Sequence, residues 1–562
     1  MTDGQGYYAY LPAVFLYQDL QFSFVDSLKQ TYYKEGKRAK FIIETPDGNV
    51  NKYFAGTAVL EAPFFLVGRC LSAVVDAPVD GYSWPFQLVI GLAAIVYLIL
   101  GLFFLGRLLY AFGFDEKTVR VTLLFTLFGT NLLYYTVYEP SMSHVFSFFT
   151  ISLFLFALER AHHTTIRKWF FLTAIALGLT ILIRPTNGII VLGLPIVTGG
   201  LAGTVRLFKH LFSDVKMLLC AALIVLILAG LQPLSYFAQT GSPIVWSYEG
   251  EGFNFLNPEF YNVLFSYRKG LFIYCPILLL ALLGVAVGIF KNRGRYAWLA
   301  IYLFVSTWII SSWWMWYYGG SYGHRAFIEH YPFFAIGLAA LIMHGLSAIK
   351  PWVFMTISMV LILLQGIQTY QFNKHIITFD NMTKTKYWNL FLRTGDDLAW
   401  YYSGYEGQDS YVGVDSLVVK HDFETERGWG NEHQIIENPT SQGLAAKMTS
   451  GDGYGPTFRK PVSEINIALN NVRIKTRVNS NSRNSNVALV CSLEDSAGNS
   501  YFWQRYPLRP QFRGAGNWCD ASALFRSGAP RDVSDTFVIY PMKTDESSVL
   551  LDDFEVSFIQ AK

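Results

Sequence analysis

Residues 313–330 read WWMWYYGGSYGHRAFIEH and lie between two apolar runs of about the length of a membrane-spanning helix. The stretch is therefore predicted to be a short loop at one face of a membrane. Its Trp and Tyr residues are typical of the lipid headgroup level. Its glycines allow the backbone to approach a ligand closely, and the planar guanidinium of Arg325 matches the geometry of a phosphate. The stretch indicates a membrane protein with a phosphate-binding surface loop.

The composition of the whole chain supports a membrane protein. Hydrophobic residues make up 52% of the 562 residues and charged residues 15%, whereas average soluble proteins contain about 25% charged residues. The formal net charge of +3 is too small to favour nucleic-acid binding, so no nucleic-acid partner is expected. A chain of this length is expected to form two or more domains.

Ten apolar segments approach the roughly 20 residues that a bilayer requires. They lie near 84–112, 119–137, 144–160, 168–185, 187–205, 215–236, 270–290, 296–312, 330–346 and 351–370. We therefore predict a transmembrane domain of about ten spans over residues 84–370. Residues 1–83 are predicted to be a first outward loop with interfacial helices. The apolar run within them contains Glu61, Pro63 and Arg69, and central charges are costly in a bilayer.

Lysine and arginine are concentrated in alternate loops, which places those loops in the cytoplasm. These basic residues lie at 117–120, 160–168, 206–216, 291–295 and 350. The other loops, 138–143, 184–188, 237–269 and 313–330, then face outward. The N-terminal segment and everything after residue 371 also lie outside. A chain that starts outside without a signal sequence requires an upstream spanning helix, so we expect one before Met1.

The C-terminal part has a different composition. Residues 371–410 are polar and aromatic and are predicted to be a linker or collar. From 411 to 562, short stretches of alternating hydrophobicity are separated by turn residues, which predicts an exported antiparallel β-sandwich. Cys491 and Cys519 both lie in this part, and an exported domain would allow them to form a disulfide.

Two outward segments contain candidate groups for acid–base chemistry or metal binding. Asp3 lies in TDGQGYY, and a carboxylate is the usual base for a hydroxyl acceptor; alternatively it is a solvated residue in an Asp-Gly turn. Glu139 and His144 lie in YEPSMSH and are candidate contacts to a divalent metal or to an acceptor. The alternative there is a loop in which Ser143 caps the next helix.

Four basic or imidazole side chains are candidate phosphate ligands. Arg184 lies at the outer end of a span in RPTN, where the alternative is that it snorkels to the headgroups. His324 and Arg325 lie in the glycine-rich loop, where such groups together suit a phosphate; the alternative is an aromatic belt with a local ion pair. Lys269 enters a span from the outside, against the positive-inside tendency.

The motifs DGQGYYAYLP, YEPSMSH, RPTN and WWMWYYGGSYGHR, in this order and on one side of the membrane, resemble the GT-C superfamily of polyprenyl-phosphate-sugar-dependent glycosyltransferases. Protein O-mannosyltransferases and the aminoarabinose transferases of lipid A are the most similar branches. The resemblance covers about residues 1–370. It implies a GT-C-like fold in the bacterial inner membrane, with the C-terminal domain in the periplasm.

The resemblance also implies an activity and a set of roles. A sugar would move from a polyprenyl-phosphate donor to a hydroxyl on a glycan, lipid or protein acceptor, with inversion at the anomeric carbon. Asp3 would be the catalytic carboxylate, and Glu139 would help to hold a divalent metal or the acceptor. Arg325 with His324 would contact the phosphate. The family's acidic residues are often adjacent, whereas Gly4 follows Asp3 here, so metal dependence is left open.

The C-terminal sandwich resembles carbohydrate-binding or galactose-binding-like jelly-roll modules. Trp429, Trp503 and Trp518 are candidates to stack on sugar rings; alternatively they fill the sandwich core.

Three rival functions fit parts of the sequence. A transporter or flippase for lipid-linked sugars would place ionisable residues near the bilayer midplane and often shows inverted repeats. An O-antigen ligase or polymerase would use outward Arg and His residues but would not need Asp3. A surface-glycan scaffold would use the sandwich alone.

Overall fold

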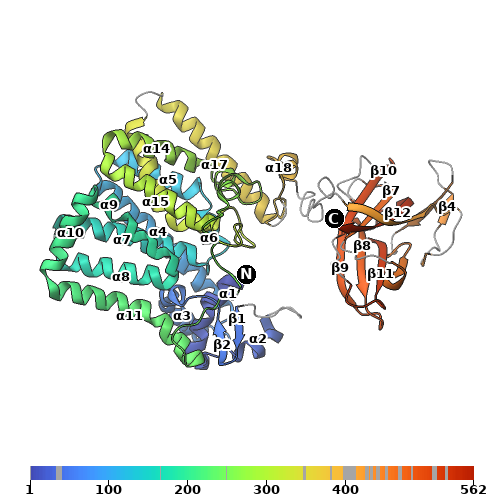
Figure 1. Ribbon diagram of the computed structural model, residues 1–562, viewed down its shortest axis with the longest axis horizontal. Coiled ribbons are helices and arrows are strands. Elements are labelled where there is room, and N and C mark those ends of the chain that lie inside the picture. The colour runs from blue at the N-terminus through green and yellow to red at the C-terminus, as the bar shows by residue number, and fades with distance from the viewer. Residues whose placement is uncertain are drawn as a thin grey trace. The chain divides into compact units, whose positions relative to one another are not determined.

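The computed structural model divides the chain into two compact units, residues 1–370 and 371–562, and each is described by itself. Residues 2–561 are described except 33–40, 165, 249, 346–349, 380–381, 396–412, 425–428, 431–434, 438–442, 450–452, 466–470, 483–484, 509–515 and 526–529. The first unit is helical and the second consists mainly of strands (Figure 1). The predicted class, a polytopic helical membrane unit followed by an all-β unit, is confirmed.

Six helices in the described part of the first unit are long and apolar enough to cross a membrane. They are α3 (Gly56–Val74), α4 (Trp84–Ala111), α7 (Ser143–Thr164), α11 (Val215–Thr240), the run Arg325–Gly345 that contains α16 (Tyr331–Ala340), and α17 (Pro351–Asn373). A seventh candidate is the pair Pro185–Thr198 and Leu201–Ser213, bent by 108° at its break.

The unit contains further helices, most of them shorter than these. They are α1 (Thr2–Pro12), α2 (Phe24–Tyr32), α5 (Glu116–Phe128), α6 (Leu132–Val137), α8 (Arg167–Ile183), η2 (Pro185–Gly193), α9 (Leu194–Thr198), α10 (Leu201–Ser213), α12 (Phe260–Phe265), α13 (Leu271–Tyr274), α14 (Ile277–Lys291), α15 (Arg293–Ser311) and η3 (Arg325–His330). All ten segments predicted to span therefore contain helix, but several are short or broken. The helix is interrupted between α5 and α6, where the side-chain amide of Asn131 donates a hydrogen bond to the carbonyl oxygen of Tyr322 at 3.0 Å.

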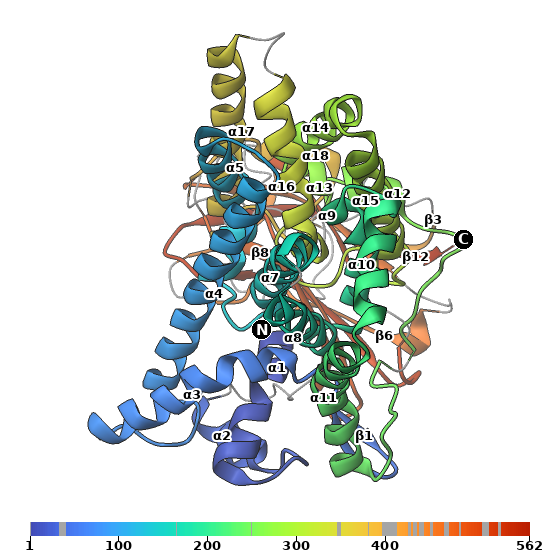
Figure 2. The same cartoon turned by 90° about the vertical axis from the view of Figure 1, so that its left-hand side faces the viewer.

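The helix α7 lies inside the bundle. Its most apolar 18-residue stretch is 94% buried, against 11% for α11. Its sequence SFFTISLFLF carries no charge and contains only Ser and Thr as polar residues, as expected of a helix that is surrounded by other helices. In contrast α3, predicted to be interfacial, lies at a steep angle to α4 (Figure 2), although its composition also permits a span.

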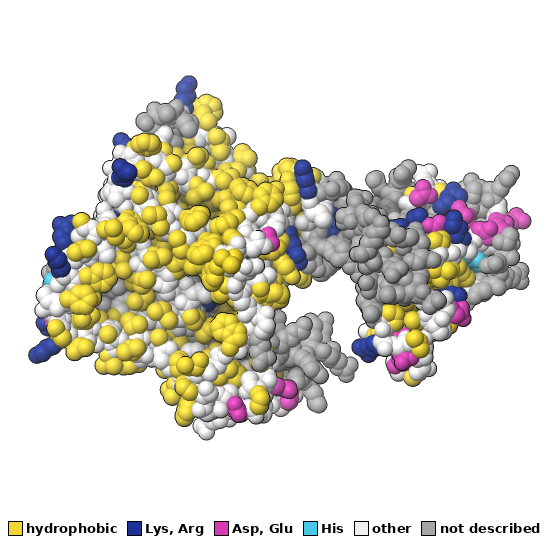
Figure 3. Space-filling model, in the orientation of Figure 1, with side chains coloured by type: hydrophobic (Ala, Val, Ile, Leu, Met, Phe, Trp, Pro, Cys, Tyr) yellow, Lys and Arg dark blue, Asp and Glu magenta, His cyan; other side chains and the backbone are white. Residues whose placement is uncertain are grey.

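Basic side chains gather at one edge of the helical unit, where α10 lies (Figures 1 and 3). The described part of residues 1–83, predicted to be the first outward segment, forms a small compact body built from α1, α2, α3 and the hairpin of β1 (Ile42–Thr45) and β2 (Gly48–Asn51). A buried aromatic cluster that includes Tyr7, Tyr10, Phe22 and Phe41 holds this body together. It fixes the N-terminal turn of α1, and with it the position of Asp3.

The C-terminal unit is a two-sheet β-sandwich. One sheet has the order β10-β7-β12-β5-β4, with β3 also paired to β12, and the other has the order β6-β11-β8-β9. The strands are β3 (Gly413–His421), β4 (Ile435–Glu437), β5 (Leu444–Met448), β6 (Phe458–Pro461), β7 (Asn471–Ser480), β8 (Val487–Glu494), β9 (Ser500–Pro507), β10 (Cys519–Phe525), β11 (Thr536–Lys543) and β12 (Val549–Ala561). A short helix, α18 (Lys384–Leu390), precedes them.

Strand β7 shows why the alternating pattern folds in this way. Val472, Ile474 and Val478 are buried in the core between the sheets, whereas Lys475 lies on the other face and pairs with Glu555 at 2.7 Å. Period-two alternation is what a half-buried strand requires. Cys491 and Cys519 are both buried as free thiols.

Candidate active site

A cavity of about 380 Å³ lies where five segments of the helical unit meet. These segments are the start of α1, the residues after β2, the start of η2, the loop 246–253, and the run from the end of α15 to η3. Three of the loops predicted to face outward, at 184–188, 237–269 and 313–330, therefore line one cavity. Its charged and histidine lining residues are Asp3, Lys52, Arg184, Glu251, Arg325, Glu329 and His330.

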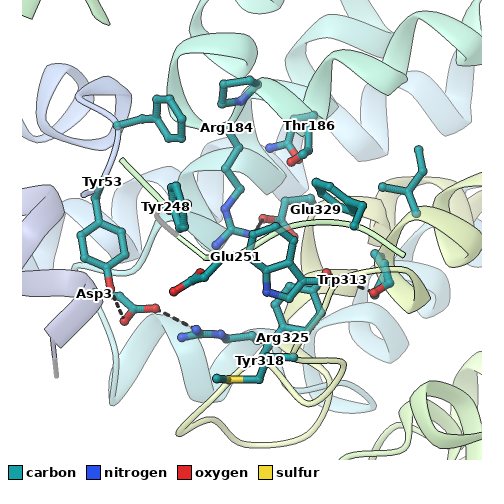
Figure 4. Close-up of a pocket in the computed structure, with 18 of the residues that line it drawn as sticks. Asp3, Tyr53, Arg184, Thr186, Tyr248, Glu251, Trp313, Tyr318, Arg325 and Glu329 are labelled. Carbon is teal, nitrogen blue, oxygen red and sulfur yellow. Dashed lines mark hydrogen bonds and ion pairs between the residues drawn. The ribbon is translucent and has the colours of Figure 1, made fainter. Parts of the chain in front are cut away.

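Asp3 and Arg325, which are far apart in the sequence, form an ion pair on the cavity wall (Figure 4). Arg325 Nη2 lies 2.7 Å from Asp3 Oδ2, and the Tyr53 hydroxyl donates to Asp3 Oδ1 at 2.7 Å. Burial alone raises the pKa of Asp3, but the charge of Arg325 and the bond from Tyr53 outweigh it and the pKa is lowered. Asp3 is thus an ionised carboxylate at neutral pH.

Arg184 has a separate acidic partner. Its Nη1 lies 3.0 Å from Glu329 Oε1, and the same oxygen lies 3.1 Å from His144 Nδ1. The side chains of Glu329 and His144 are 1% and 0% exposed, whereas that of Arg184 is 20% exposed. His144 therefore lies behind the cavity wall and supports Glu329. Arg184 and Glu329 both line the cavity, and Arg184 is the more exposed of the two.

Glu139 lies next to this cavity without lining it. It is 6% exposed and bonds to Tyr134. Burial raises its pKa to about 7, an effect that the nearby charge of Arg325 reduces and that of Asp3 increases. Glu139 is thus close enough to Asp3 and Arg325 to be affected by their charges, but it lies outside the cavity lining.

Lys269 is hydrogen-bonded to the glycine-rich loop. The buried ammonium group of Lys269 donates to the carbonyl oxygen of Gly319 at 2.9 Å, to the hydroxyl of Ser321 at 2.6 Å and to the carbonyl oxygen of Ser321. Burial lowers the pKa of His324 to about 3, so its neutral ring donates from Nε2 to the carbonyl oxygen of Trp316 at 3.0 Å. Both residues, predicted as phosphate ligands, contact the loop backbone and do not line the cavity.

Backbone conformation explains one glycine of this loop. Gly319 has φ = +63° and lines the cavity, with open space where a Cβ would be. A left-handed conformation of this kind favours glycine. The glycine therefore serves the turn, and it also leaves the cavity wall bare at this point.

Several lining residues were not among the predicted site residues. Lys52 forms an ion pair with Glu251, and its ammonium lies 5.0 Å from the centre of the Tyr248 ring. The loop 237–269 contains Glu249, Glu251 and Glu259, and this acidic content is the sequence feature that points to Glu251. Lys52 and Tyr53 lie in a mixed polar segment in which neither stands out.

The donor groups do not fit a metal cluster. Within the described ranges, no three His, Cys, Asp or Glu side chains are grouped so that they would hold a metal ion. His144 and Glu329 contact each other, while the carboxylate of Asp3 is taken up by Arg325 and Tyr53. We therefore derive no step through a metal.

The three tryptophans of the sandwich lie in different environments. Trp429 is 8% exposed and packs against Phe458 and Phe554, so its position fits the core alternative. Trp503 is 51% exposed on β9, and its indole donates to the hydroxyl of Tyr540 at 3.0 Å. Trp518 is half-buried, with the guanidinium of Arg477 at 5.2 Å from its ring.

Comparisons with known proteins give fold likenesses. Neither a family model nor a curated protein matches the chain. The arabinosyltransferase EmbB from Mycobacterium smegmatis is similar at 12% identity and a TM-score of 0.35 over 89% of this chain and 59% of that chain. The CBM22-1 xylan-binding domain of Xyn10C from Paenibacillus barcinonensis is similar at 16% identity and a TM-score of 0.20 over 27% of this chain and 99% of that domain. With identities this low, a function has to come from the geometry of the cavity.

Proposed function

We propose that this protein is a membrane glycosyltransferase that moves a sugar from a polyprenyl-phosphate donor to a hydroxyl acceptor on the outer face of the bacterial inner membrane. The observation that carries the proposal is the convergence of Asp3, Arg184 and Arg325 on one cavity of about 380 Å³. A cavity of this size holds a small ligand, and a carboxylate beside two guanidinium groups suits a sugar attached to a phosphate.

Each group has a task in a single displacement. The carboxylate of Asp3 takes the proton of the acceptor hydroxyl as the acceptor oxygen bonds to the anomeric carbon. The bond from the anomeric carbon to the phosphate oxygen breaks, and its electron pair stays on the phosphate. Arg325 and Arg184 stabilise the negative charge that develops there. One displacement inverts the anomeric configuration.

The apolar rim of the cavity supports a lipid-linked donor. Trp246 and Trp314 both line the cavity and are 63% and 50% exposed. Apolar surface therefore continues from the charged interior to the outside of the helical unit. A polyprenyl chain would run along this surface, with its phosphate at the arginines.

The first experiment measures release of free polyprenyl phosphate by the purified full-length protein. The probes are polyprenyl-phosphate hexoses and pentoses labelled in the polyprenyl chain. We expect donor consumption by the wild type and a loss of roughly 100-fold or more in Asp3→Asn, which keeps the size but removes the base. Asp47→Asn, at the exposed turn of the β1–β2 hairpin, removes the same charge outside the cavity and should behave as the wild type.

Two results would count against this function. A normal rate in Asp3→Asn would show that Asp3 is not the base. Movement of the labelled lipid across proteoliposomes without loss of its sugar would instead identify a transporter.

A glycan acceptor would find a second contact on the sandwich. We propose that the exposed face of Trp503 stacks on a sugar ring, because an exposed indole beside a tyrosine hydroxyl offers both stacking and hydrogen bonding. Retardation of the wild type in gels that contain soluble polysaccharides, lost in Trp503→Ala, would support this contact.

A further inference from the structure

The two arginines of the cavity are paired with carboxylates of very different accessibility. Glu329, the partner of Arg184, is 1% exposed and is also held by His144. Both carboxylates line the cavity, but the side chain of Asp3, the partner of Arg325, is 22% exposed. Asp3 is therefore the carboxylate with which a substrate can exchange a proton, whereas Glu329 is held by Arg184 and His144.

Arg325 is placed to change partners. Its side chain is 11% exposed, and its Nε has no hydrogen-bond partner among the residues that the structure describes. Arg184 extends into the same cavity, while the guanidinium of Arg325 points towards Asp3 (Figure 4). An anion between them would gain both positive charges, but it would have to compete with Asp3 for Arg325.

The charges of the proposed reaction fit this competition. The donor is a phosphodiester with one negative charge, and the released polyprenyl phosphate is a monoester that gains a second. During the same step Asp3 gains a proton and loses its negative charge. The negative charge that Arg325 contacts at Asp3 therefore disappears in the same step in which a negative charge appears on the phosphate.

We propose, on the basis of the function above, that the Asp3–Arg325 ion pair is a charge switch that couples proton transfer to departure of the phosphate. Donor binding draws Arg325 away from Asp3, which leaves the carboxylate free to accept the acceptor proton. The neutral Asp3 no longer competes for Arg325, so the full charge of Arg325 stabilises the leaving phosphate. Arg184 stays balanced by Glu329 throughout and serves as a fixed phosphate contact.

The switch makes an unusual prediction for Asp3→Asn, which is that loss of the base tightens phosphate binding. The probe is a short-chain polyprenyl monophosphate, titrated into the full-length protein in detergent micelles. Removing the competing carboxylate should lower its Kd roughly tenfold, given the strength of close charge interactions inside proteins. Binding of the uncharged polyprenol should not change.

Two variants serve as controls. Asp47→Asn tests for a general effect of net charge and should leave the Kd unchanged. In the Arg325→Gln background, Asp3→Asn should no longer tighten binding, because the contested guanidinium is gone.

Unchanged or weaker binding of the monophosphate by a folded Asp3→Asn protein would overturn the switch. Asp3→Ser gives the same comparison if Asp3→Asn does not fold. The results distinguish the charge switch from the proposed function. If Asp3→Asn loses sugar transfer but does not bind the monophosphate more tightly, the switch alone is contradicted. If Asp3→Asn binds more tightly but the wild type consumes no donor, the competition for Arg325 is supported and the proposed function is contradicted.

Discussion

Glu139 shows what burial does to a single carboxyl group at the edge of the cavity. Its pKa is raised to about 7, so the folded protein favours the protonated form. Between the ordinary pKa of a glutamate and 7, the folded state binds more protons than the unfolded state, and stability falls as the pH rises. Above pH 7 the full penalty is present, about 3 kcal/mol.

We therefore expect Glu139→Gln to be more stable than the wild type at pH 8 and equally stable at pH 4.5. Glutamine keeps hydrogen-bonding capacity towards Tyr134 but cannot ionise. Melting temperatures in detergent across this range test the expectation. Parallel curves for the two proteins would show that Glu139 is not the group responsible.

At the scale of residues, a site residue can be predicted from the sequence when its charge contrasts with the apolar residues near it in the chain. Asp3, Arg184 and Arg325 stand out because they are charged residues close to apolar runs, and all three line the cavity. Lys52 and Tyr53 do not stand out, since they follow a polar hairpin and reach the cavity only through the packing of the first outward segment. Their roles depend on tertiary contacts that have no local signal.

At the scale of elements, the loop before η3 depends on one buried cation. Lys269 donates to three oxygen atoms of Gly319 and Ser321, and these acceptors would lose their partner in Lys269→Met. Unsatisfied buried acceptors cost roughly 1–3 kcal/mol each. We expect faster amide hydrogen exchange over residues 313–324 and a lower melting temperature.

The neighbouring Arg268 provides a matched control for this prediction. Its guanidinium lies 3.6 Å from the centre of the Tyr317 ring, so Arg268→Met removes an adjacent positive charge without taking a partner from those oxygens. Equal exchange in both variants would indicate that the loop does not rest on Lys269.

Helix positions were easier to predict than helix continuity. Long apolar runs require helices in a bilayer, and helices are present in all ten predicted segments. Breaks such as that before Asn131 were not predicted. They depend on a distant acceptor, the carbonyl oxygen of Tyr322, which no local pattern identifies. The alternating strands of the sandwich were visible in the sequence because strands such as β7 bury one face only.

At the scale of the whole molecule, each unit has its own hydrophobic core. The sandwich core includes Trp429, which packs against Phe458 and Phe554, while the cavity is formed by residues of the first unit alone. Damage to one core should therefore leave the other unit folded. Calorimetry of the wild type should show two transitions.

Trp429→Ala should lower only one of these transitions, because removing a buried tryptophan costs about 3–5 kcal/mol. Binding of the short-chain polyprenyl monophosphate to the first unit should remain at the wild-type Kd. Trp503→Ala is the matched control, since its side chain is 51% exposed, and it should move neither transition. A single transition that shifts as a whole in Trp429→Ala, with loss of phosphate binding, would show instead that the two units fold as one.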